Sequence, residues 1–231
     1  LYSLNTPNVA KVYIMLELLE LPFEVVTVNI MKGDQFKDEY IQINPNSKIP
    51  AIADPNVPAG SQPIILFESG NILVYLAQIY GQGNYLPNSQ SNAQEHYNVL
   101  GWLFFQMSSI GPNMGQYHHY TAYTKDNVDY SRKRHYNEVR RLFHVIEKQL
   151  AKHAFVAGHQ LSIADVAIYP WSKYIHTYPD LSESEFPLLY DYHRRMALLP
   201  ASQSYERYND SLSDAKKTEL SEEERKILFG R

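Results

Sequence analysis

The chain has 231 residues, no cysteine, and 21 basic against 25 acidic side chains, which gives a formal net charge of −4. This length suits one large domain or two moderate ones. The acidic balance and the lack of a long basic run argue against a nucleic-acid partner. The absence of cysteine excludes disulfide scaffolds, thiolate metal sites and cysteine nucleophiles, so any thiol chemistry needs a thiol that arrives with a ligand.

Membrane insertion is not expected, because no apolar run approaches ~18 residues. The sequence opens on Leu1 rather than Met, and a strand-like segment follows at once, so we expect any targeting signal to lie upstream. A cytoplasmic location is our default expectation, although a chain without cysteine is compatible with any compartment.

The first eighty residues alternate between strand and helix patterns. Strands are predicted over 1–4, 24–30, 49–53 and 64–67, and helices over 8–20, 35–43 and 68–80. The segment from Glu24 to Ile30 is rich in Val and Ile, which predicts a buried strand. The order βαβαββα predicts one small sheet with a parallel crossover and an antiparallel edge.

The remainder of the chain reads as helices only. They are predicted over 93–109, 128–153, 162–177 and 186–199, and the buried stripe of the second consists of Val139, Leu142, Phe143, Ile146 and Leu150. Ile110-Gly111-Pro112 is expected to break the first. We therefore expect a domain over 1–80, a linker over 81–92, a helical domain over 93–200, and a tail over 201–231 for which a short docked helix and disorder are both open.

Thr6-Pro7-Asn8 precedes the first predicted helix. Thr suits the N-cap and Pro the first helical position, so an ordinary helix start explains the motif. A helix start also offers free N–H groups and a positive dipole end, which favour a thiolate placed beside it. The sequence leaves both interpretations open.

Lys48-Ile49-Pro50 opens the third predicted strand. Proline cannot donate to a sheet ladder, so its position there is unusual unless the Ile49–Pro50 bond is cis. Such a turn would leave the Ile49 backbone free to pair with an extended, peptide-like ligand, whereas a simple turn proline is the alternative.

Glu68 and Ser69 lie at the first turn of the helix predicted over 68–80. Plain capping explains them. The functional alternative is that Ser69 holds a carboxylate while Glu68 pairs with an ammonium, which together would receive an amino-acid head group.

In this order, these motifs resemble the glutathione-binding domain of the glutathione transferases. The resemblance continues to about residue 200 through segments similar to the Nu class, the bacterial group with glutathione-dependent disulfide-bond reductase activity. These segments are Trp102-Leu103-Phe104-Phe105-Gln106, Gly111-Pro112-Asn113-Met114-Gly115-Gln116 and His118-His119-Tyr120. The resemblance implies an α+β thioredoxin-like N-terminal domain and an all-α C-terminal domain.

The resemblance also implies site residues. The residues that would bind glutathione are Asn8, Gln35, Lys48, Ile49, Glu68, Ser69 and Arg134, and the catalytic set is Thr6, Asn8 and Arg134. Thr6 would lie nearest the sulfur, and Arg134 would reach the ligand from the helical domain. Where relatives commonly have Gly after Thr-Pro-Asn, this chain has Val9, and the segment around 115–119 is shorter than in the longest members.

The activity implied is reduction of small disulfide substrates by a glutathione thiolate, with two glutathiones or glutathione disulfide per site in a homodimer. Conjugation of glutathione to small electrophiles is one alternative, and a non-catalytic glutathione-binding regulator is another. No metal is expected, because His118 and His119 are adjacent and make a poor ligand pair. Asp165, in a helix-capping motif with Ser162, is predicted to be structural.

Overall fold

The computed structural model describes residues 1–212 and 220–230 and divides into two compact units. The first unit consists of Leu1–Leu76 together with Ser204–Arg231, and the second of Ala77–Gln203. The boundaries expected at residues 80 and 93 stay predictions. Across the described residues, no helix is long and apolar enough to cross a membrane.

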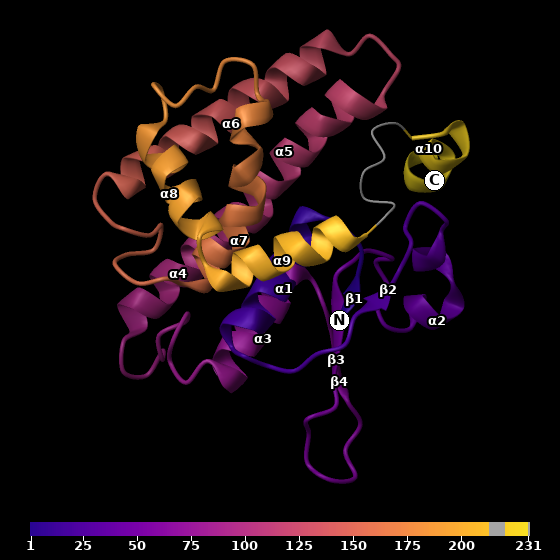
Figure 1. Ribbon diagram of the computed structural model, residues 1–231, viewed down its shortest axis with the longest axis vertical. Helices are drawn as coiled ribbons and strands as arrows, with labels where there is room; N and C mark the ends of the chain where they lie inside the picture. The colour runs from indigo at the N-terminus through magenta and orange to yellow at the C-terminus, as the bar shows by residue number, and fades with distance from the viewer. Residues whose placement is uncertain (213–219, 231) are drawn as a thin grey trace. The chain divides into compact units, whose positions relative to one another are not determined.

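The first unit contains a sheet and the helices that follow its strands (Figure 1). Its elements are β1 (Tyr2–Ser3), α1 (Pro7–Leu18), β2 (Val26–Thr27), a 3₁₀ turn (Asp34–Phe36), α2 (Asp38–Ile41), β3 (Ala51–Asp54), β4 (Ile64–Phe67) and α3 (Ser69–Tyr80), which continues into the second unit. The predicted βαβαββα order is confirmed, and with the helical second unit so is the fold class.

The four strands lie in the order β2-β1-β3-β4, with β1 parallel to β2 and antiparallel to β3, and β3 antiparallel to β4. The expectation of a long buried strand over 24–30 is wrong: β2 has two residues, and Val26 is 48% exposed. The reason is the pairing partner, since β2 pairs only with β1, which itself has two residues.

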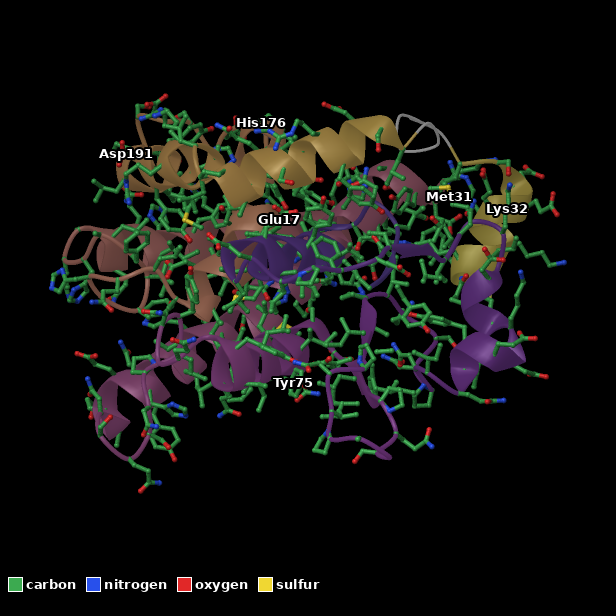
Figure 2. The ribbon with its side chains drawn as sticks, turned by 60° about the horizontal axis from the view of Figure 1, so that its bottom comes forward. Glu17, Met31, Lys32, Tyr75, His176 and Asp191 are labelled. Atoms are coloured by element: carbon green, nitrogen blue, oxygen red, sulfur yellow. The ribbon has the colours of Figure 1, made fainter. Side chains whose placement is uncertain are left out.

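Helix α1 is the most deeply buried element of this unit. Val9, Val12, Ile14 and Met15 are each fully buried. Burying an aliphatic side chain of this size contributes about 1.5–3 kcal/mol to stability, so this helix anchors the unit. Tyr75 of α3, labelled in Figure 2, donates from its hydroxyl to Asp54 Oδ2 at 2.7 Å and ties α3 to the end of β3.

The end of the chain supplies two further helices. They are α9 (Pro200–Ser211), which begins in the second unit and ends in the first, and α10 (Glu222–Phe229). Within the first unit, the ring of Tyr208 stacks on that of Tyr13, with centroids 4.9 Å apart. A helix is therefore present within the expected tail, and residues 213–219 lie outside the described part of the chain.

The second unit consists of helices. They are α4 (Ala93–Phe105), α5 (Gly111–His118), α6 (Asp129–Leu150), α7 (Ile163–Ser172) and α8 (Pro187–Ala197), with π-helical turns at Gln106–Ile110 and His119–Tyr123 and a 3₁₀ turn at Lys173–Thr177. All five residues of the stripe predicted for α6 are buried. Asp165 at the start of α7 is fully buried and accepts from Ser162 N and Val156 N, both at 2.9 Å.

The predicted break at Ile110-Gly111-Pro112 is wrong, because the chain continues as helix. The Gly111 N–H donates to the Gln106 carbonyl, five residues back, in a π-helical turn. This wider turn starts a new helical segment at Gly111. Pro112 then lies in the first turn of α5, where proline is tolerated.

Candidate functional site

The sheet brings three of the predicted motifs to one end. Tyr2, Ala51 and Phe67 are paired across β1, β3 and β4. Because β3 runs antiparallel to both neighbours, the residues after Ser3, before Ala51 and after Phe67 all lie beyond the same end of the sheet. Neighbouring strands are about 4.8 Å apart. The chain therefore gathers Thr6, the Ile49–Pro50 turn and Glu68-Ser69 at one end.

Thr6 is the N-cap of α1, as predicted. Its backbone is extended, with φ −145° and ψ 152°, and its Oγ1 accepts from Val9 N at 3.2 Å. Pro7 is the first residue of the helix. Since the Val9 N–H uses Thr6 Oγ1 as an acceptor, the Thr6 hydroxyl proton can be donated to a ligand. The positive end of the helix dipole lies at the same place.

Asn8 follows as the second residue of α1 and is partly buried. It stands one residue past Pro7, at the same helix start as Thr6. Its contact with a ligand stays a prediction.

Two side chains hold the turn before β3 in place. Tyr40 Oη and Asn44 Nδ2 donate to the Lys48 carbonyl at 2.7 Å and 2.6 Å. The Ile49–Pro50 bond is cis, which confirms that interpretation of the sequence. Ile49 is buried, whereas the Lys48 side chain is exposed and accessible to a ligand.

Gln35 carries a buried acceptor that no hydrogen bond of the described protein satisfies. The side chain is 3% exposed, and its Nε2 donates to the Ile30 carbonyl at 3.0 Å. Its Oε1 has no hydrogen-bond partner. A buried polar atom without a partner costs free energy, and a ligand N–H would satisfy it.

Glu68 and Ser69 form the junction between β4 and α3. Glu68 has φ +66°, an uncommon left-handed conformation for a residue with a side chain. Strained backbone of this kind clusters at ligand sites. The Glu68 carbonyl accepts from Ile72 N at 2.9 Å, and the Glu68 side chain is exposed. Ser69 is 3% exposed at the first position of α3.

Sequence reasoning missed Lys11. This lysine is 1% exposed, and its Nζ donates to Ser69 Oγ at 3.3 Å. Burial lowers the pKa of Lys11 to about 7, and the charge of Glu68 opposes that shift. The available signal was a single lysine inside the apolar run from Val9 to Leu16, since a lysine on a buried helix face requires a polar partner.

Arg134 belongs to the second unit. It lies on α6 with an exposed side chain, and its contact with a ligand stays a prediction. In the same unit, burial lowers the pKa of the His118 imidazole, with a smaller contribution from His119. No group of three or more His, Asp or Glu side chains among the described residues could hold a metal ion.

Comparison with known families agrees with this geometry. Residues 6–79 match the glutathione S-transferase N-terminal domain, and residues 110–200 match the glutathione S-transferase C-terminal domain. The chain is 37% identical over 202 residues to the disulfide-bond oxidoreductase YfcG of Escherichia coli, covering 87% of this chain and 91% of that protein.

Solved structures are similar over most of the chain. A glutathione transferase family member from Pseudomonas fluorescens with two glutathione bound has a TM-score of 0.79 and 36% identity, covering 88% of this chain and 89% of that one. A glutathione transferase from Pseudomonas putida with one glutathione disulfide bound per subunit has a TM-score of 0.79 and 37% identity, covering 88% of each chain. The chain belongs to the glutathione S-transferase family.

Proposed function

We propose that this chain is an enzyme that uses the thiolate of bound glutathione to reduce disulfide substrates. The observation that carries the proposal is a helix start capped by Thr6 at the sheet end that also holds Ile49–Pro50 and Ser69, in a chain without cysteine. The reacting sulfur must therefore arrive with the ligand. The similarity to YfcG, a disulfide-bond oxidoreductase, supports this direction.

Each end of glutathione has a matching group at this site. Its peptide backbone would lie along the Ile49–Pro50 turn, with a ligand N–H on Gln35 Oε1. The α-carboxylate of the γ-glutamyl residue would accept from the Ser69 hydroxyl, and the ammonium would pair with Glu68. Lys48 and Asn8 complete the proposed binding set.

The sulfur would lie at the start of α1. Free thiols titrate near ~8.5, so only a few per cent is thiolate at neutral pH. The helix dipole and a hydrogen bond from the Thr6 hydroxyl both favour the thiolate. Thiol–disulfide exchange needs a good thiolate and access to it, and it needs no acid–base pair.

The reaction requires two glutathiones. The first thiolate attacks one sulfur of the substrate disulfide, its S–S bond breaks, and one substrate thiol leaves. A second glutathione thiolate attacks the mixed disulfide, which releases the other substrate thiol and glutathione disulfide. The two glutathiones in the Pseudomonas fluorescens structure support this stoichiometry, and Arg134 is the proposed contact for the anionic pair. Nu-class membership, a homodimer and a cytoplasmic location belong to the proposal on the resemblance described above.

The test is reduction of 2-hydroxyethyl disulfide by glutathione, measured on the wild type and on Arg134→Ala. Arg141→Ala on the same helix is the control, because Arg141 is occupied by an ion pair with Glu138. We expect turnover in the wild type and the control and a clear loss in Arg134→Ala.

Two outcomes would overturn the reductase proposal. Turnover of 1-chloro-2,4-dinitrobenzene without disulfide reduction would identify a conjugating enzyme. Glutathione binding without turnover of either substrate would identify a non-catalytic binding protein.

A further inference from the structure

Lys11 is a basic residue enclosed by the apolar interior of the first unit. It is 1% exposed, and its helix neighbours Val9, Val12, Ile14 and Met15 are fully buried. Lysines are almost never buried to this degree unless they are paired, because an enclosed ammonium loses its hydration. A side chain that costs stability at a candidate site calls for a functional explanation.

The ammonium is directed at the proposed carboxylate-binding residue. Lys11 Nζ donates to Ser69 Oγ at 3.3 Å across 58 residues of sequence, and Ser69 is itself 3% exposed. Glu68, the residue before Ser69, interacts electrostatically with Lys11. Lys11 therefore connects α1, which starts at the proposed thiolate position, with α3, which starts at the proposed carboxylate position.

The direction of the Lys11–Ser69 hydrogen bond determines how the Ser69 hydroxyl can bind a ligand. A protonated Lys11 has donors only, so in that state Ser69 Oγ accepts from Lys11. The Ser69 hydroxyl then donates to a group other than Lys11, and in the proposed complex that group is the ligand carboxylate. A carboxylate bound at Ser69 would accept a hydrogen bond from the Ser69 hydroxyl. It would also bring negative charge toward the buried Lys11 cation. Both interactions are stronger in a low-dielectric interior.

We propose that Lys11 is a positioning residue that acts through the Ser69 hydroxyl to select ligands carrying the α-carboxylate of a γ-glutamyl group. The inference deepens the proposed function and rests on it. The competing explanation is purely structural, with Lys11 serving only to hold α1 against α3.

The test compares two ligands on five proteins. The ligands are S-methylglutathione, whose sulfur cannot ionise, and the same molecule with the γ-glutamyl α-carboxylate replaced by hydrogen. The proteins are the wild type, Lys11→Met, Ser69→Ala and the double variant, and Lys148→Met, which removes an exposed lysine on α6, is the control. Affinities are measured by titration calorimetry, and folding is checked by urea unfolding of each variant.

We expect Lys11→Met to weaken S-methylglutathione binding by about tenfold, the usual effect of losing one charge-assisted hydrogen bond. Binding of the ligand without the carboxylate should stay within about twofold, because the lost interaction requires a carboxylate. The double variant should lose less than the sum of the two single losses, since part of the effect of Lys11 passes through Ser69. Equal affinities in Lys11→Met and wild type, or equal losses for both ligands, would overturn the inference.

A measurement on the wild type alone covers the case in which Lys11→Met does not fold. Calorimetry in buffers of different ionisation enthalpy should show proton uptake when S-methylglutathione binds at pH 7.5, because a bound carboxylate favours the protonated lysine. The ligand without the carboxylate should show none, and equal uptake by both would contradict the inference. A wild type that binds neither ligand would instead refute the proposed glutathione function.

Discussion

The Tyr205 hydroxyl donates to the main-chain carbonyl of Thr6 at 3.4 Å, across 199 residues of sequence. The same hydroxyl lies 3.3 Å from Asn5 Oδ1. Tyr205 is 2% exposed, and its ring packs edge-on against Tyr13, with centroids 5.5 Å apart. The part of α9 that belongs to the first unit thus contacts the loop of Asn5 and Thr6, which leads into α1.

Tyr205→Phe should therefore lower disulfide reduction more than it lowers stability. The ring contacts remain, so the loss of unfolding free energy should be about 0.5–1.5 kcal/mol, the worth of one hydrogen bond. Turnover and urea unfolding are measured together. Tyr208→Phe is the matched control, because its hydroxyl pairs with Ser3 Oγ at 3.0 Å and not with the Thr6 loop. Equal effects of both variants on turnover would show that α9 provides packing only.

Thr6→Ala should lower both stability and turnover. The variant loses the N-cap hydrogen bond to Val9 N, which costs about 1 kcal/mol, and it loses the proposed donor to the thiolate. Thr6→Ser keeps the hydroxyl and should keep most of both properties. Stopped-flow turnover and the pH at which bound glutathione ionises, read from thiolate absorbance, provide the measurements. An unchanged ionisation pH in Thr6→Ala would remove Thr6 from the thiolate site.

Gln35→Met should weaken glutathione binding by about fivefold, since about 1 kcal/mol is the usual net value of one hydrogen bond. It should also cost about 1 kcal/mol of stability, because the Ile30 carbonyl loses the Gln35 Nε2 donor. The substitution removes the buried Oε1 acceptor that lacks a protein partner. Gln42→Met, at an exposed position after α2, is the control and should bind like the wild type. Unaltered affinity in Gln35→Met would place the ligand away from this residue.

Because of Lys11, the free energy of unfolding should change with pH between about 7 and 10.5. The pKa of Lys11 is about 7 in the folded protein and about 10.5 in the unfolded chain. Between these values the unfolded chain binds the proton more tightly, so the free energy of unfolding rises with pH through this window and is flat below it. Lys11→Met lacks this titration. Its advantage in unfolding free energy over the wild type should be largest near pH 7, a few kcal/mol in order of magnitude, and should shrink toward pH 10. Urea unfolding of both proteins across this range tests it, and parallel pH profiles would contradict it.

Asp165→Asn should destabilise the second unit. The Asp165 carboxylate accepts from Ser162 Oγ at 2.7 Å and from the main-chain N–H groups of Ser162 and Val156. An amide has one acceptor atom in place of two, so a buried donor is left unsatisfied at a cost of about 1–3 kcal/mol. Asp191→Asn removes an exposed ion pair with Arg195 and should cost under about 1 kcal/mol. Thermal unfolding of both variants tests this. Equal decreases in Tm would show that Asp165 contributes no more than an exposed ion pair.

Features that depend on neighbours along the chain could be predicted before the fold was known. The Thr6-Pro7 cap and the buried stripe of α6 follow from local patterns because each rests on the chemistry of a few consecutive or periodically spaced residues. The pattern at Ile49–Pro50 left a cis bond and a simple turn proline both open, and the structure has the cis bond. The order of the elements also followed, since their periodicities change where the backbone changes. The resemblance of those motifs then identified the family.

Features that depend on partners far away in the sequence could be seen in the folded chain alone. The strand predicted over 24–30 is limited to Val26–Thr27 because its partner β1 has two residues, which the composition of 24–30 does not reveal. Lys11 meets Ser69, and Tyr205 meets Thr6, through contacts whose sequence separation no local periodicity encodes. Burial and pairing of polar groups arise only when separate elements pack together, so the support beneath the candidate site was visible only in the folded chain.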